Sequence, residues 1–200
     1  MGSGSVTEAT DPDVFLPTLG DVVTTLDAWA GPYVIFGSVA IHVYVDHPPA
    51  EDVDVLVRAE DVDLAVEALA RSGFEPGERR DWIRKAHRDG VLVDVITRVR
   101  GGFGADAPLI EHARRAVYRG VEAPIPAPED LVLIAAASAH PETPDHWFTA
   151  RKLLAGVDVD WDYLRERSML APVRMASLLL YCRSDDVAVP DEVLASLLPH

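Results

Sequence analysis

The sequence has one cysteine, Cys182, among its 200 residues. A single thiol excludes an intrachain disulfide and a zinc site built from cysteines, and it favours a reducing cytoplasm. Lysine is almost as rare, because Lys85 and Lys152 are the only two, and the formal net charge is −15. A chain with so much negative charge repels polyanions at long range, which disfavours nucleic acid as a partner.

The chain also lacks a long apolar run. The longest one, Leu131 to Ala137, is far shorter than the roughly 20 residues that a membrane helix needs. The first residues lack the basic and apolar pattern of a secretory leader, so we expect a cytoplasmic protein with no membrane partner. The opening MGSGS is typical of a flexible start, and we predict a flexible tail over residues 1–12.

The pattern of apolar and turn residues predicts an α+β (α/β) fold with a core over residues 13–126. The dipeptide Asp89-Gly90 is a strong signal for a tight hairpin between two strands. After Pro126 strand-like runs cease, and we predict an all-helical C-terminal lobe over residues 127–200. Strands are expected at 33–36, 53–57, 82–88, 91–96 and, as an edge strand, 121–125; helices are expected at 16–30, 39–45, 60–71, 106–118, 129–139, 146–155, 161–167, 173–183 and 192–198.

Aspartates on otherwise apolar strands carry the strongest chemical signal. Side chains alternate along a strand, so Asp52 and Asp54 share one face while the neighbouring valines occupy the other. Asp94 has the same apolar flanks on a strand that would lie beside the first. Buried carboxylates are costly unless a cation meets them, and hard oxygen ligands favour Mg²⁺. We predict a Mg²⁺ site at these three residues, with capping or surface carboxylates as the alternative.

A glycine–serine turn, Gly37-Ser38, lies fourteen residues before the carboxylate pair. Glycine permits close approach of the backbone, and the N–H groups at the start of a helix favour an anion. The Ser38 hydroxyl would donate to a terminal phosphate. The alternative is a plain strand-to-helix turn in which Ser38 is only the N-cap.

The order strand, Gly37-Ser38, short helix, Asp52-x-Asp54 and a later Asp94 resembles the nucleotidyltransferase superfamily typified by DNA polymerase β. Within it, the chain resembles uncharacterised bacterial nucleotidyltransferases and the toxins of type IV toxin–antitoxin systems. The resemblance covers most of residues 33–198 and includes the segment APED before the helical lobe. It implies a small mixed β-sheet with flanking helices. It also implies transfer of a nucleoside monophosphate from an NTP, such as ATP, onto an acceptor hydroxyl, with release of pyrophosphate.

By that resemblance, Gly37 and Ser38 would hold the triphosphate, and Asp52 and Asp54 would ligate Mg²⁺. Asp94 would complete the metal site and take the proton of the acceptor hydroxyl. These residues are therefore the predicted catalytic and binding groups.

The chain departs from the resemblance in its positive charges. Relatives often carry Arg and Thr where this chain has Pro48 and Ala50, and the lysines that commonly follow the core are missing. Arg84, Lys85 or Arg151 are the residues that would supply this charge to the nucleotide.

The sequence leaves the acceptor open between a small-molecule alcohol, RNA and protein. The acidic composition suits a cationic small molecule, while the basic segment at residues 79–88 offers a positive wall for a triphosphate. The missing positive charges also favour a different class of protein. In that alternative, the chain is a catalytically degenerate binding module that acts as a toxin–antitoxin or regulatory partner through its helical lobe.

Overall fold

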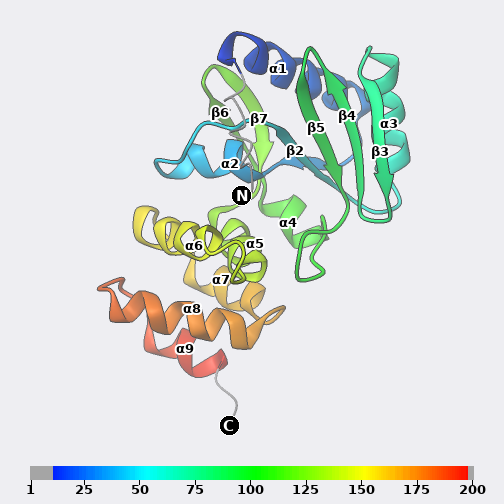
Figure 1. Cartoon of the computed structure of the whole chain (residues 1–200). Coiled ribbons are helices and arrows are strands. Elements are labelled where there is room, and N and C mark those ends of the chain that lie inside the picture. Colours follow the sequence, from blue (N-terminus) through cyan, green and yellow to red (C-terminus); the bar gives the residue numbers. More distant parts are fainter. Residues whose placement is uncertain (1–10, 198–200) are drawn as a thin grey trace, which may run out of the picture.

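Two sheets and a set of helices make up the chain in the computed structural model, which describes residues 11–197 (Figure 1). The strands are Tyr33–Ile35 (β1), Val53–Val57 (β2), Glu75–Arg80 (β3), Ile83–Arg88 (β4), Val91–Ile96 (β5), Arg114–Tyr118 (β6) and Val121–Ile125 (β7). The helices are Pro12–Trp29 (α1), Gly37–Tyr44 (α2), Val62–Arg71 (α3), Ala107–His112 (α4), Pro128–Ser138 (α5), Asp145–Gly156 (α6), Trp161–Ser168 (α7), Pro172–Ser184 (α8) and Asp191–Leu197 (α9).

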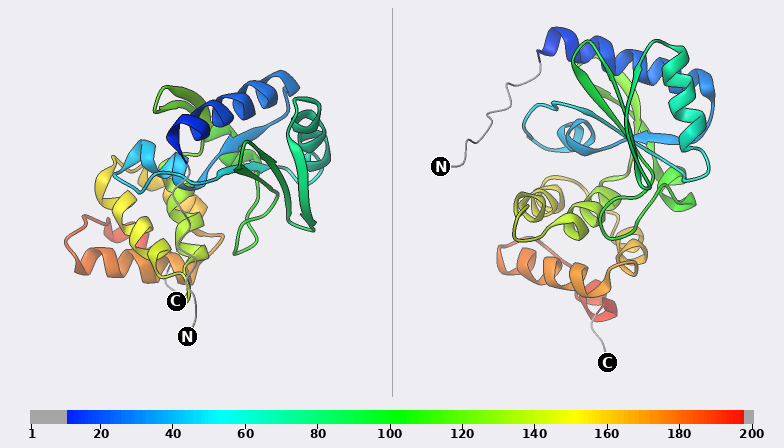
Figure 2. Two further views of the ribbon diagram at one scale, coloured as in Figure 1. Left: turned by 45° about the horizontal axis from the view of Figure 1, so that its top comes forward. Right: turned by 45° about the vertical axis from the view of Figure 1, so that its right-hand side comes forward.

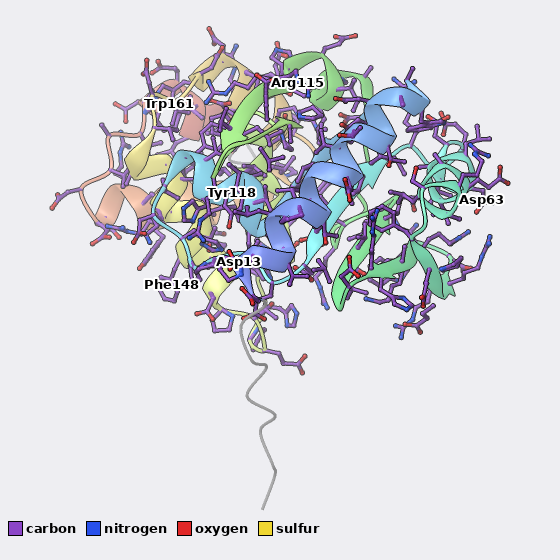
Figure 3. The ribbon with its side chains drawn as sticks, turned by 90° about the horizontal axis from the view of Figure 1, so that it is seen from above. Asp13, Asp63, Arg115, Tyr118, Phe148 and Trp161 are labelled. Carbon is purple, nitrogen blue, oxygen red and sulfur yellow. The ribbon has the colours of Figure 1, made fainter. Side chains whose placement is uncertain are left out.

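A five-stranded mixed sheet has the order β1-β2-β5-β4-β3. β2 and β5 are parallel, whereas the other neighbouring strands pair antiparallel. Helices α1 and α3 cover one face of this sheet, and α1 lies across the top of the molecule when it is seen from above (Figure 3). Helix α2 contacts β2 and also α5 and α6 of the helical lobe, which lies below the sheet in Figure 1.

The predicted hairpin at Asp89-Gly90 is confirmed, because β4 and β5 pair on either side of it. Both turn residues have positive φ, +52° for Asp89 and +82° for Gly90. These angles are those of a type I′ turn, which matches the twist of the flanking strands.

Helix α1 starts earlier than predicted. Its first residue is Pro12, and the Asp11 side chain accepts a hydrogen bond of 3.0 Å from the Asp13 backbone N–H. Pro17, the second residue of the predicted helix, is therefore inside α1. The predicted tail at residues 1–12 otherwise lies outside the described residues, as does the predicted last helical residue, Leu198.

The predicted helix over residues 106–118 is wrong in its second half. Helix α4 ends at His112, and β6 follows and pairs with β7. Arg119 and Gly120 turn the chain with φ values of +47° and +93°. Tyr118 is buried and packs edge-to-face against the His42 ring, so the packing of alternate residues overrides the helical pattern. β7 therefore belongs to this separate hairpin beside β1 rather than to the edge of the main sheet.

The C-terminal helices form where the sequence predicts them, and their bounds differ by one or two residues. Helix α5 is buried on almost every side because α6, α7 and α8 pack around it (Figure 2). Across residues 11–197, every helix is too short or too polar to cross a lipid bilayer.

A buried ionic network joins the two parts. The Arg167 guanidinium on α7 donates to Asp130 on α5 at 2.6 Å and to Asp106, the N-cap of α4, at 2.7 Å. The Tyr163 hydroxyl donates to the second oxygen of Asp130 at 2.8 Å. The acidic end of the APED segment thus has a structural role, because it fixes the helical lobe to the core.

Candidate active site

Three carboxylates converge where β2 and β5 run side by side. Asp54 and Asp94 are paired directly in the parallel register, and Asp52 lies two residues before Asp54 on the same face. One carboxylate oxygen from each residue lies within 4.8 Å of the corresponding oxygens of the other two. The structure therefore brings together the three aspartates that the sequence predicts as metal ligands.

The electrostatics of this cluster favour a cation. Burial, together with repulsion from the Asp52 and Asp94 carboxylates, raises the pKa of Asp54 to about 8, although the Lys85 ammonium opposes this rise. Burial, followed by repulsion from Asp94, also raises the pKa of Asp52. A divalent cation relieves such repulsion, and three converging carboxylate oxygens are the hard ligands that Mg²⁺ takes. The donor set fits the predicted ion.

Gly37 brings a helix N-terminus against this cluster. Its φ is +61°, and a Cβ atom at this position would lie 2.1 Å from Oδ2 of Asp54. The Phe36 N–H donates to the Asp54 carbonyl at 3.0 Å, which fixes the turn to β2. Only glycine accommodates both the backbone angle and the close approach.

Helix α2 begins at Gly37, so its N-cap is Phe36 and not Ser38. No side chain caps this helix start. The first N–H groups of α2 are thus left for water or an anion, beside a carboxylate cluster suited to Mg²⁺. Ser38 lies in this first turn.

Of the predicted positive residues, the structure brings Lys85 to the cluster. Lys85 is paired with Asp94 across β4 and β5, and its ammonium donates to both oxygens of Asp94 at 2.9 Å. Arg84 points to the other face of the sheet, where its guanidinium lies 3.4 Å from Asp63 of α3. Arg151 is paired with Asp185 in the helical lobe. The structure thus does not bring Arg84 or Arg151 to the carboxylates.

A pocket of about 250 Å³ adjoins the carboxylates on the side of the helical lobe. Its walls come from α2, β2, the segment after β5, and α5, and they are mostly apolar. Trp82, Arg100 and His146 are lining residues that sequence reasoning did not assign to the site. No local motif marks them, since they converge only when the lobe packs on the sheet. The other lining residues are Phe36, Gly37, Ile41, Asp54, Ile96, Val99, Leu131, Ile134, Ala135 and Ser138.

The basic segment at residues 79–88 is interleaved with acids rather than gathered into a positive surface. Arg79 lies 2.9 Å from Asp63, and Arg88 lies 3.1 Å from Asp21. Arg80 is paired with Glu78 at 2.7 Å. These pairs neutralise most of the positive charge that the sequence offered as a wall for a triphosphate.

Residues 47–182 match the model of a family described as uncharacterised nucleotidyltransferase. The match spans more than half of the chain and contains all three aspartates. The chain therefore belongs to this nucleotidyltransferase family, which confirms the predicted enzyme class. No curated protein matches the chain.

Solved structures share the fold at low sequence identity. The antibiotic-resistance factor ANT(2'')-Ia in solution is 16% identical with a TM-score of 0.60, over 87% of this chain and 100% of that one. An antigenic nucleotidyltransferase-like protein from Paracoccidioides brasiliensis is 18% identical with a TM-score of 0.57, over 94% and 95%. The lincomycin-bound lincosamide antibiotic adenylyltransferase LnuA is 12% identical with a TM-score of 0.50, over 75% and 100%. The predicted α+β nucleotidyltransferase fold is confirmed.

Proposed function

We propose that this chain is a Mg²⁺-dependent enzyme that transfers a nucleoside monophosphate from an NTP, such as ATP, onto a hydroxyl of a small molecule and releases pyrophosphate. The observation that carries the proposal is the contact between Gly37, at the start of α2, and Asp54 of the three-carboxylate cluster. This contact supports the proposal because a helix start suited to an anion, next to carboxylates suited to a cation, is the pair of sites that a Mg²⁺-nucleotide needs.

Each residue then has a defined role. Asp52 and Asp54 would hold Mg²⁺, which when bound neutralises phosphate charge and stabilises the leaving pyrophosphate. The N–H groups at the start of α2 and the Ser38 hydroxyl would hold the terminal phosphates. Asp94 would accept the proton of the acceptor hydroxyl as the hydroxyl oxygen attacks the α-phosphorus of the NTP. The pocket beside Asp54 would exclude water from the apolar part of a substrate.

A cationic small-molecule alcohol is the acceptor that the electrostatics favour. The chain has a net charge of −15, and its basic segment is paired with acids, so a polyanion such as RNA gains little attraction. Two of the structural neighbours are described as an antibiotic-resistance factor and a lincosamide antibiotic adenylyltransferase, which supports a small-molecule acceptor here. A cytoplasmic location would supply both ATP and Mg²⁺.

The test is transfer itself. The purified chain would be incubated with Mg²⁺, each of the four NTPs and a panel of acceptors that includes aminoglycosides, lincosamides and tRNA. We expect pyrophosphate release and a product heavier by one nucleoside monophosphate, with a cationic alcohol and not with tRNA. Asp52→Asn should abolish both signals. Nucleotide binding without transfer to any acceptor would instead support the degenerate binding module.

A further inference from the structure

The Lys85 ammonium lies within the carboxylate cluster, against Asp94. The ammonium nitrogen lies 2.9 Å from Oδ1 and 2.9 Å from Oδ2 of Asp94. The contact is fixed by the backbone, because Lys85 and Asp94 are directly paired in β4 and β5. Both side chains are largely shielded from solvent, 27% and 12% exposed, so the pair is not a loose surface contact.

The position of this ammonium limits how many ions the cluster can hold. A Mg²⁺ ligated by a carboxylate lies about 2.0–2.1 Å from its oxygen. An ammonium held between the two oxygens of Asp94 occupies the inner lone pairs of this carboxylate, so that only its outer lone pairs are left for an ion. The two cations would also repel each other strongly at this distance.

The formal charges agree with the geometry. Three ionised carboxylates carry −3, the Lys85 ammonium carries +1, and one divalent cation brings the sum to zero. Two divalent ions beside the ammonium would leave +2 in a partly buried site, which is unfavourable before a nucleotide is bound.

We propose that the Lys85 ammonium takes the place of the second metal ion, so that the site binds a single Mg²⁺ between Asp52 and Asp54. This inference rests on the proposed function. Lys85 is then a positioning residue: it holds Asp94 toward the acceptor and supplies the positive charge that a second ion supplies in a two-metal site.

Metal stoichiometry tests the inference without turnover. Mn²⁺ would be titrated into the full chain, alone and with a non-hydrolysable ATP analogue, and bound ion would be followed by electron paramagnetic resonance. After subtraction of the ion held by unbound analogue, we expect one Mn²⁺ per wild-type chain and two per Lys85→Met chain. Arg88→Met is the matched control, because it removes one positive charge from the same strand on the opposite face and should keep one ion.

The kinetics give a second readout. The rate of transfer should depend on the first power of Mg²⁺ concentration in the wild type and on a higher power in Lys85→Met. Two ions in the wild type, or one ion in folded Lys85→Met, would overturn the inference while leaving the proposed transfer intact. No bound ion in the wild type would overturn the proposed function as well. If Lys85→Met does not fold, the wild-type stoichiometry decides alone.

Discussion

Gly37, at the turn between β1 and α2, is in contact with the Asp54 side chain of β2. A Cβ atom at Gly37 would lie 2.1 Å from Oδ2 of Asp54. We therefore predict that Gly37→Ala displaces either the carboxylate or the helix start. Transfer activity should fall by about two orders of magnitude or more, because a misplacement of about 1 Å has that effect on catalysis. The measurement is kcat/KM for the nucleotide.

Gly73→Ala is the matched control for this change. Gly73 also has a positive φ, +91°, but nothing lies within 4 Å of a Cβ atom placed there. Both variants should lose about 1–2 kcal/mol of stability from the backbone angle. Only Gly37→Ala should lose activity, and a fully active Gly37→Ala would remove the anion-binding role of the turn.

A second prediction concerns the stability of the metal-free protein. Burial and the neighbouring carboxylates raise the pKa of Asp54 from 3.8 to about 8. A carboxyl with a raised folded pKa stabilises the fold at low pH, and this stabilisation is lost as the pH rises from about 4 through about 8. A tenfold change in proton affinity corresponds to about 1.4 kcal/mol, so Asp54→Asn should raise the free energy of unfolding by about 1–3 kcal/mol at pH 8 in EDTA.

Urea unfolding at pH 5 and pH 8 measures this difference. Mg²⁺ should raise the melting temperature of the wild type more at pH 8 than at pH 5, and it should have little effect on Asp54→Asn. Asp162→Asn is the control, since this carboxylate is exposed in a surface ion pair and should change stability by at most about 0.5 kcal/mol. If Asp54→Asn and the wild type have the same free energy of unfolding at pH 8 in EDTA, the proposed repulsion is contradicted.

The sequence predicts the centre of this site because its signals are local. Asp52 and Asp54 share a face because side chains alternate along a strand. The turn Asp89-Gly90 determines the β4–β5 hairpin, which contains Asp94. The sequence also marks Gly37, although the reason for glycine there, the Asp54 carboxylate, is a tertiary contact.

The rest depends on packing that no local pattern encodes. Residues 114–118 contain arginine and alanine, which favour helices, yet they form β6, which pairs with β7 and buries Tyr118 against His42. Residues 75–80 form β3 with every side chain exposed, so they lack the apolar alternation that marks a strand. Arg84 and Lys85 are adjacent and both basic, so the sequence does not show which of them reaches the site. Because side chains alternate along β4, Arg84 points toward Asp63 and Lys85 toward Asp94.

A third prediction tests the joint between the two parts. Arg167 is 5% exposed and Asp130 is buried beside it, so Arg167→Met would leave a buried carboxylate with the Tyr163 hydroxyl but without its ionic partner. We expect a loss of about 3–5 kcal/mol in unfolding free energy. The double variant Arg167→Met with Asp130→Asn should be less destabilised than the sum of the single variants, as measured by denaturant unfolding. Additive losses would show that the two groups do not interact.

The final prediction concerns the acceptor. Salt should have opposite effects on the two substrates, because the acceptor is cationic and the nucleotide is anionic. An acidic protein attracts a polycationic acceptor and repels the nucleotide, and salt screens both effects, with a Debye length of about 10 Å at 0.1 M. Between low and high salt, kcat/KM for an aminoglycoside-like acceptor should fall by about 3–10-fold, whereas KM for Mg²⁺-ATP should stay constant or decrease. A neutral alcohol of similar size is the control and should show little change. If salt weakens nucleotide binding and leaves the cationic acceptor unaffected, the net charge does not select the acceptor, and local contacts in the pocket beside Asp54 must do so.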